Sequence, residues 1–557
     1  MVLPMKTNKM SFVVLASVSS LCLAVTAQTQ QPVPMSLATG FNTIREDRLR
    51  ADLTFLASDA LQGRMSLQTG DDVAIQWIAS EFAKAGLKPA ANGSFLQPVE
   101  LIEYRGDRAQ SYVVLKRGGG EKQWKFPEAL GAYRSDVDVT GDVVFAGFGI
   151  TAPELHYDDY QGIDANGKIV LIFDHEPQET DPASIFNGTG NTRYATGRVK
   201  ILNAQAHGAV GVLIVGEPNR KHPSNQERVA RIGGSITRAV PLPSQALAED
   251  ELHTPAAIIS DAAAKELFAT SGTEPSQLQA AIDRDLKPQS RALPDTQVTL
   301  HYRNTSVATG KTYNVAGLLE GSDLKLKAET ILFSGHHDHD GISGDQIWHG
   351  ADDNASGSVG VVALAYAFAA NAARDDKPKR SLLFVVFAAE ERGLLGSFYM
   401  AAHPLRPLET TRAVINFDMI GRNETESDQT KGLIEIPADT TNRLNLIGPS
   451  YSPDYNRTVV RENKYVGLDL DYRFDRDYAL NIFFRSDQFP FVLHNIPSFW
   501  WFTGFHPDYH HTTDTADKIN YVKMAKILRL AYLTSFQFAN EAATPKFVAN
   551  PGGKPLS

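Results

Sequence analysis

The sequence predicts an α/β protein whose mixed, mostly parallel sheet is sandwiched by helices and whose chain is interrupted by an inserted β-rich module. Strands and helices alternate from Val298 to Ala542, which is typical of a parallel sheet covered on both faces. Residues 136–285 instead contain short β-branched strands punctuated by glycine. The 557 residues, 43% of them hydrophobic and 21% charged, suffice for more than one folded domain.

The first thirty residues are typical of a secretory signal. A basic start is followed by an apolar stretch over residues 11–25 and by the small-residue cleavage site Val25-Thr26-Ala27. We therefore expect a signal peptide at 1–27 and export to the periplasm or the extracellular space. An uncleaved membrane anchor is the alternative; after cleavage we expect no stable membrane insertion. A lipid anchor on Cys22 is less favoured, because Leu21 and not a small residue stands directly before this cysteine.

The composition restricts the chemistry and the partners. Cys22 is the only cysteine, so the processed chain has no disulfide and any metal must be bound by His, Asp and Glu. The formal net charge is −10 and no long basic run occurs, which argues against a nucleic-acid partner.

The chain opens with helices that belong to the main domain. Apolar residues at helical spacing predict helices over 44–57 and 72–85. We expect one discontinuous domain made of residues 36–135 and 286–545, with the module of residues 136–285 inserted into it. Within this module the sequence predicts strands at 137–150, 168–172 and 210–215, short strands within 241–259, and helices at 199–207 and 262–270.

The second part of the main domain carries the clearest alternation. Its predicted strands are 331–335, 382–387, 413–417 and 498–503, and its predicted helices are 358–372, 394–402 and 524–542. Residues 546–557 are rich in proline and glycine, so we expect a disordered tail.

Five candidate metal ligands occur in segments of this alternating region, most of them at or just after predicted strands. They are His336, Asp353, Glu391, Asp418 and His510, in SGHHDHDG, GADDNASG, FAAEERGLLGS, INFDMIGRN and PDYHHTTDT. Sites in open α/β sheets form beyond the carboxyl ends of the strands, so the segments should converge on one edge. Each motif alone could be a turn, a helix cap or a surface loop. It is much less probable that all five occur together by chance.

The donor set favours two metal ions and one free carboxylate. Imidazoles and carboxylates suit zinc, and also cobalt or manganese. Two histidines and three acids suffice for two ions if one carboxylate bridges, and ions about 3.5–4 Å apart can polarise a carbonyl and generate hydroxide. Glu390 is adjacent to Glu391, and neighbouring side chains of an extended segment point in different directions. Glu390 can therefore take a proton while Glu391 binds metal.

These segments resemble those of the co-catalytic di-zinc exopeptidases, which include aminopeptidase Y, bacterial leucyl aminopeptidases and glutamate carboxypeptidase II. The resemblance covers most of residues 40–540 and implies the zinc-exopeptidase fold, two Zn²⁺ per chain and peptide substrates. Residues 136–285 are similar to the protease-associated domain that many members carry as an insertion. This domain is either a spacer or a substrate-gating element.

The resemblance also implies metal-ligand roles. His336 and Asp418 would bind one ion, Glu391 and His510 the other, and Asp353 would bridge them and precede a cis peptide bond.

The remaining implied roles are catalytic or supporting. Asp338 would orient His336, Glu390 would be the general base, and Tyr509 would stabilise the tetrahedral oxyanion. Asp340 and His349 depart from the family pattern at positions that are not ligands, where they can alter the support of the ligands and the substrate fit.

The function that we expect is an exported di-zinc aminopeptidase. It would release N-terminal residues by metal-hydroxide attack, with Glu390 as the base. The alternatives are a carboxypeptidase or dipeptidase of the same family, a glutaminyl cyclase, which uses one zinc ion, and an inactive receptor, which would have lost ligands. The side-chain preference is open; Trp500, Trp501 and Phe505 are candidates for the pocket wall or for core packing.

Overall fold

The computed structural model of this protein describes Met1, residues 31–224, Glu227, Arg231, Arg238, and residues 240–374 and 376–549. Residues 2–27 of the expected signal peptide and residues 550–557 of the expected tail lie outside the described residues.

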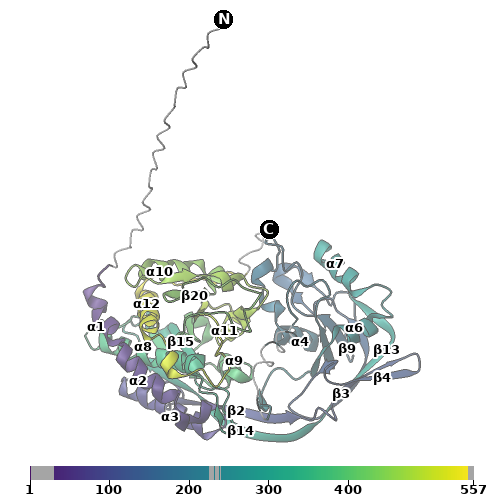
Figure 1. Cartoon of the computed structure of the whole chain (residues 1–557), viewed down its shortest axis with the longest axis horizontal. Helices are drawn as coiled ribbons and strands as arrows, with labels where there is room; N and C mark the ends of the chain where they lie inside the picture. The colour runs from purple at the N-terminus through teal and green to yellow at the C-terminus, as the bar shows by residue number, and fades with distance from the viewer. Residues whose placement is uncertain are drawn as a thin grey trace.

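The larger sheet is mixed, with parallel strands at its centre (Figure 1). Its strand order is β11-β2-β14-β18-β15-β19-β22-β20-β21, and β1 pairs with β14. Strands β18, β15, β19 and β22 are mutually parallel, while β14 and β20 flank them in antiparallel pairs. The bounds are β1 Lys88–Pro89, β2 Leu96–Gly106, β11 Ser244–Leu247, β14 Asn304–Leu319, β15 Thr330–His336, β18 Ser381–Phe387, β19 Thr411–Phe417, β20 Arg443–Ile447, β21 Asp469–Asp471 and β22 Ser498–Phe502. The four central strands confirm the predicted strands of the alternating region.

Helices cover both faces of this sheet because successive residues of its strands point to opposite sides. Ile331 and Phe333 of β15 pack in the core that contains α8, whereas Leu332 packs with Met400 of α9 and Phe491 of α11. The first face carries α1 Met35–Thr43, α2 Glu46–Leu56, α3 Thr69–Lys84, α8 Gly357–Ala372, α10 Pro453–Asn463 and α12 Tyr521–Asn540; the second carries α9 Leu395–Ala402 and α11 Phe489–Leu493.

One described helix, over Ala351–Ala372, is long and apolar enough to cross a membrane by length and composition. Of its apolar window, 78% is buried inside the protein. Its apolar character therefore serves the core between α12 and the sheet.

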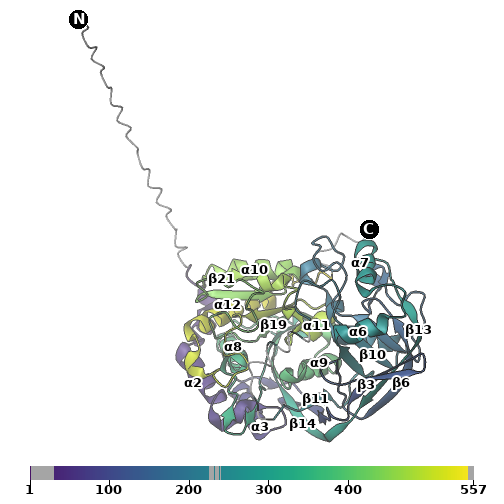
Figure 2. The same ribbon diagram turned by 45° about the vertical axis from the view of Figure 1, so that its right-hand side comes forward.

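A second sheet forms the other half of the molecule, on the right of Figures 1 and 2. Its order is β4-β3-β13-β6-β9-β10-β12-β5, with β6, β9, β10 and β12 parallel. The bounds are β3 Tyr112–Arg117, β4 Gly120–Trp124, β5 Ala129–Leu130, β6 Val137–Phe145, β9 Ile169–Phe173, β10 Gly211–Val215, β12 Ala256–Ile259 and β13 Arg291–Tyr302, with helices α4 Gly197–Ala206, α6 Asp261–Phe268 and α7 Pro275–Asp285. The sheet thus draws on strands before and after residues 136–285.

The two halves share a long pair of strands. Antiparallel β2 and β14 run along the bottom of both views and lead from one half into the other (Figures 1 and 2). Strand β11, which falls inside residues 136–285, pairs with β2 and so belongs to the larger sheet. The second half is therefore fastened by strand pairing as well as by its covalent connections to the larger half.

Candidate metal centre

The five candidate ligands meet at the carboxyl ends of the central parallel strands. His336 is the last residue of β15, Asp418 directly follows β19, and Glu391 lies in the short turn after β18. His510 lies in the loop after β22, and Asp353 in the turn that leads into α8. Because β18, β15 and β19 are neighbours in one sheet, residues far apart in the sequence come together here.

The first group of donor atoms surrounds His336. Its Nε2 lies 3.4 Å from Asp353 Oδ1, 3.6 Å from Asp418 Oδ1 and 3.6 Å from Glu390 Oε2. Its Nδ1 lies 3.1 Å from the Asp338 carbonyl oxygen, to which it can only donate. In the neutral ring Nε2 then carries a lone pair, and this buried atom has no hydrogen-bond partner among the described residues. Such an orphaned nitrogen among carboxylates fits a bound cation.

The second group surrounds His510 and shares Asp353 with the first. His510 Nε2 lies 3.2 Å from Asp353 Oδ2 and 3.3 Å from Glu391 Oε2. The two oxygens of Asp353 therefore face two different imidazoles, as a bridging carboxylate requires. His510 Nδ1 lies 3.0 Å from Asp340 Oδ2 and can donate to it, which directs Nε2 toward the ligands.

The donor set fits zinc-class ions. Ligand atoms at zinc–nitrogen and zinc–oxygen bond lengths around a tetrahedral ion lie about 3.3–3.6 Å apart, close to the 3.2–3.6 Å separations found here. Burial lowers the pKa of His336, but the surrounding carboxylates raise it well above its usual range. Burial raises the pKa of Asp353, but the imidazoles hold it well below its usual range. The centre thus contains several buried acids whose negative charge a bound cation would stabilise.

The backbone around Asp353 is held from several sides. Asp514 Oδ2 accepts hydrogen bonds from the amides of Asp352 and Asp353, at 2.9 and 3.2 Å. Asn354 donates to the Phe417 carbonyl, beside Asp418. The Asp353–Asn354 peptide bond is cis, as the family resemblance implied.

Asp338 supports both sides of the centre. Its carbonyl oxygen faces His336, and its carboxylate accepts the amides of Glu390 and Glu391 at 3.0 and 3.2 Å. The carboxylate itself lies farther from His336 Nδ1, at 3.7 Å. Asp338 therefore orients the imidazole through its main chain and fixes the Glu390–Glu391 turn through its side chain.

A cavity of about 460 Å³ opens beside these residues. It is lined by Thr196, Arg198, Asp353, Glu390, Glu391, Gly393, Leu394, Phe398, Asp418, Met419, Phe484, Arg485, Phe489, Trp500, Phe505, Tyr509 and His510. Of the two roles considered for these aromatic residues, Trp500 and Phe505 have the first and line the wall. Trp501 packs in the core, with its indole nitrogen 3.4 Å from the Tyr455 hydroxyl. Adjacent residues of β22 point to opposite faces, which separates the two tryptophans.

Tyr509 lies at the wall of this cavity. Its ring packs 4.2 Å from that of His510, and its hydroxyl lies 3.4 Å from Arg485 Nη2. Burial raises the pKa of Tyr509 to about 12, so the phenol keeps its proton at neutral pH and can donate a hydrogen bond.

The structure adds His339 and Asp340 to the centre. His339 is fully buried, and its Nδ1 lies 2.6 Å from Glu391 Oε1. Asp340 contacts His510 and forms ion pairs with Arg392 and Arg238. The histidine-rich run was a signal for both, but only the fold shows which of its members face inward: the neighbouring His337 ring contacts Asp71 instead.

Arg64 is the principal structural residue that the sequence did not indicate. Its guanidinium donates to the carbonyl oxygens of Leu56, His337, His349 and Gly350, at 2.6–2.9 Å. Burial lowers its pKa to about 10, while nearby aspartates raise it, so it stays a cation at neutral pH. Arg64 therefore ties the segment of His336 to the segment of Asp353 and places a positive charge behind both.

Comparison with known families gives two matches. The sequence model of peptidase family M28 matches residues 314–534, and that of the PA domain matches residues 139–267. The first includes all five candidate ligands. The second includes β9, β10 and β12 of the smaller half, and also β11 of the larger sheet.

Individual relatives match in part. A probable zinc metalloprotease of Pyrenophora teres f. teres (strain 0-1) is 35% identical over 118 residues, 19% of this chain and 24% of that protein. Leucine aminopeptidase 2 of Trichophyton rubrum is 28% identical over 220 residues, 36% of this chain and 38% of that protein. The chain thus spans less than two fifths of the length of these curated relatives. The solved aminopeptidase from Aneurinibacillus sp. strain AM-1 is 19% identical, with a TM-score of 0.48 over 93% of this chain and 98% of that chain.

We predict that Arg64→Ala destabilises the protein by about 3–5 kcal/mol, because it leaves four carbonyl oxygens without their donor and buried acids without their cation. The midpoint of thermal unfolding should fall by several degrees. Arg45→Ala is the control, because this exposed arginine pairs only at the surface with Asp47 and should change stability by less than about 0.5 kcal/mol. Equal midpoints for the two variants would contradict the assignment.

We predict that Asp340→Asn weakens metal binding about 10–100-fold, because the His510 imidazole loses the carboxylate that directs it. Competition with a chelator, followed by metal analysis, measures the change. His349→Gln is the matched control: it is the other departure from the family pattern, and its ring contacts Asp59 and the Thr512 carbonyl away from the ligands. An unchanged affinity in Asp340→Asn would remove this residue from the support of the centre.

Proposed function

We propose, from the match of residues 314–534 to peptidase family M28 and of residues 139–267 to the PA domain, that this chain is a di-zinc aminopeptidase that releases N-terminal residues from peptides. The observation that carries the proposal is the placement of Asp353 between two imidazoles, with one oxygen toward His336 and the other toward His510. This arrangement supports two ions that share one carboxylate.

Each zinc ion would have its own protein ligands besides Asp353. His336 and Asp418 would hold one, and Glu391 and His510 the other. When bound, the pair would supply Lewis acidity that polarises the peptide carbonyl and favours ionisation of water.

Glu390 is suited to move the proton. It lines the cavity beside the ligands. Burial and the neighbouring acids, Asp418 foremost, raise its pKa well above the usual range, against the opposing effect of His336. A carboxylate with a raised proton affinity is an effective base, and it can pass the same proton to the leaving amine. Tyr509, another lining residue of the cavity, is protonated and can donate to the carbonyl oxygen as that oxygen becomes negative.

The cavity wall supports binding of an apolar side chain. Its aromatic members are Phe398, Phe484, Phe489, Trp500, Phe505 and Tyr509. The leucine aminopeptidase named among the relatives is consistent with an apolar residue at the N-terminal position of the substrate.

Arg485 favours a second candidate, a carboxypeptidase or dipeptidase. Its guanidinium lines the cavity, and its hydrogen bonds to Tyr509 and Gln429 are long, at 3.4 and 3.5 Å. A cation so placed could bind a terminal carboxylate. Arg198, the other arginine of the wall, already pairs with Asp250 at 2.6 Å. A glutaminyl cyclase is less well supported, because it would leave one of the two donor groups unused.

The position of the PA domain beside the cavity favours a role in substrate access over a role as a spacer. Thr196 and Arg198 come from the smaller half and line the same cavity as Glu390. We also propose that the protein is exported, on the basis of its N-terminal sequence.

We predict that Glu390→Gln lowers kcat by about two to four orders of magnitude while its zinc content stays that of the wild type, because the amide keeps the shape but cannot take a proton. Peptide hydrolysis and metal analysis on the same preparation measure both. Glu409→Gln changes an exposed acid that does not line the cavity, and it should leave kcat unaltered. A Glu390→Gln enzyme with wild-type turnover would remove Glu390 from the mechanism.

The end of the peptide that is cleaved can be found by mass spectrometry of a peptide pool after exposure to zinc-loaded enzyme. We expect release of N-terminal residues from free and C-amidated peptides, and resistance of N-acetylated peptides. Removal of metal with a chelator should abolish release, and zinc should restore it. C-terminal release from N-acetylated peptides, lost on amidation and in Arg485→Gln, would instead establish the carboxypeptidase. Gln-Phe should give free amino acids; pyroglutamyl-Phe would indicate the cyclase.

A further inference from the structure

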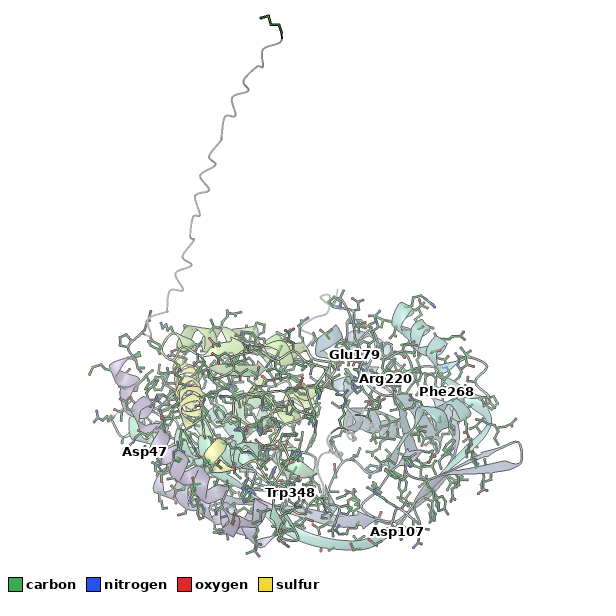
Figure 3. All side chains as sticks on the ribbon, in the orientation of Figure 1. Asp47, Asp107, Glu179, Arg220, Phe268 and Trp348 are labelled. Carbon is green, nitrogen blue, oxygen red and sulfur yellow. The ribbon has the colours of Figure 1, made fainter. Side chains whose placement is uncertain are left out.

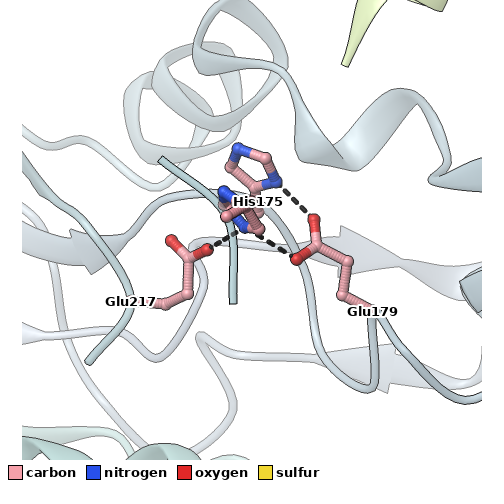
Figure 4. Close-up of side chains that lie close together, drawn as sticks. His175, Glu179 and Glu217 are labelled. Atoms are coloured by element: carbon pink, nitrogen blue, oxygen red, sulfur yellow. Dashed lines mark hydrogen bonds and ion pairs between the residues drawn. The ribbon is translucent and has the colours of Figure 1, made fainter. Parts of the chain in front are cut away.

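The smaller half contains a separate cluster of potential ligands: His175, Glu179, Glu217 and His222. Figure 4 labels the first three of them. It lies beyond the carboxyl ends of β9 and β10, which are paired in parallel with Phe173 opposite Val215. His175 and Glu217 each follow closely after these paired strand ends. Figure 3 places Glu179 in the right-hand half, apart from Trp348 beside the first centre. None of the four residues lines the cavity of that centre.

The cluster is built around the His222 imidazole. Its Nε2 lies 2.8 Å from Glu179 Oε2 and 2.7 Å from Glu217 Oε1. Its Nδ1 lies 2.9 Å from the Pro223 carbonyl oxygen, to which it can only donate. In the neutral ring, the lone pair of Nε2 is therefore directed at the space between two carboxylates. The other oxygen of Glu179 contacts His175 Nδ1, and the two imidazoles stack 4.2 Å apart (Figure 4).

Glu217 is the member of the cluster that most clearly lacks partners. It is 3% exposed. Apart from the approach of His222, neither of its oxygens has a hydrogen-bond partner among the described residues. A buried carboxylate in this state needs compensation, either from a cationic imidazole or from a metal ion.

The surrounding charge increases this need. Glu176, in the same segment, is also buried, and its carboxylate accepts from Thr192. Lys200 and Arg220 lie near enough to affect Glu217, but Lys200 donates to the Phe148 carbonyl and Arg220 pairs with Asp261. Within the described part of the chain, neither forms an ion pair with Glu217.

We propose that His175, Glu179, Glu217 and His222 bind a divalent first-row transition metal ion, of which zinc is the best match, as a structural site of the PA domain. Their ligand atoms lie within 4.8 Å of one another. Small inward shifts would bring them to the zinc–nitrogen and zinc–oxygen bond lengths of about 2.0–2.2 Å. Two imidazoles and two carboxylates form a closed tetrahedral set, which is typical of a structural rather than a catalytic ion.

The ion would join two loops of the PA domain close to the larger half. The ring of Tyr478, from the larger half, packs edge-on against His222 with ring centres 5.7 Å apart. Farther along the chain from His222, Arg238 pairs with Asp340 at 2.9 Å and stacks on Trp348. The site would therefore lie against the larger half through Tyr478.

The alternative is a metal-free cluster, and the experiment must distinguish it from the metal-bound one. Burial lowers the pKa of His222, but Glu179 and Glu217 raise it to about 10, so a protonated imidazole could hold both carboxylates by itself. Metal binding would displace that proton.

The test compares the zinc content of the full-length protein and its variants after exchange into metal-free buffer. We expect His222→Asn and Glu217→Gln each to hold one ion per chain fewer than the wild type. His207→Asn is the matched control: this histidine lies in the same half, contacts Thr151 and stacks on Tyr160, and its loss should remove no ion. Because only differences are compared, the result does not depend on how many ions the peptidase centre holds.

Equal zinc content in the wild type and both cluster variants would overturn the proposal and leave the protonated ion pair. Where the variants do not fold, anomalous diffraction from zinc-soaked crystals of the wild type decides the question. A peak among the four side chains supports the site, and its absence overturns it.

Discussion

The structure depends on the burial of many carboxylates at one edge of a sheet. Asp338, Asp353, Glu390 and Asp418 all lie at the carboxyl ends of the central strands and are at least nine-tenths buried. Isolated buried carboxylates cost several kcal/mol each, so the fold must supply positive charge and hydrogen-bond donors. Arg64 supplies a fixed cation behind the acids, and main-chain amides supply donors. The carboxylate charge that these groups do not compensate lies where two imidazoles face the carboxylates. Metal ions would fit at this position.

The same architecture recurs in both halves of the molecule. In the larger half the donors follow the parallel strands β15, β18 and β19; in the smaller half they follow the parallel pair β9 and β10. Parallel strands end at the same edge, and the loops beyond them carry main-chain groups that rigid strands hold in position. The two clusters differ in surroundings: the first opens into a cavity lined by aromatic rings, whereas the second lies apart from it. This difference agrees with a catalytic role for one and a structural role for the other.

Contacts between the halves connect the PA domain to the chemistry of the first centre. The pairing of β2 with β14 and β11 anchors the smaller half, Arg198 reaches the cavity wall, and Arg238 reaches Asp340. Because Asp340 contacts His510, a displacement of the PA domain would alter the charge beside a candidate ligand. The insertion thus has a physical route to influence both the entry of substrate and the metal centre.

The sequence alone determined the regular elements and the five donors of the first centre. Hydrophobic periodicity is local, so strands such as β15 and helices such as α8 could be predicted, and the donors could be found because they follow those strands. Only the tertiary structure decided which polar residues meet. Arg64 and the His337 carbonyl are 273 positions apart, and nothing near Arg64 indicates that its guanidinium is buried. The His175–His222 cluster has no recognisable sequence signal, because its members occur singly in polar loops and only the pairing of β9 with β10 brings them together. Strands β3, β5 and β13 lie outside residues 136–285 and yet belong to the second sheet. Composition does not indicate this, because the pairing partner of a strand can lie far away in the sequence.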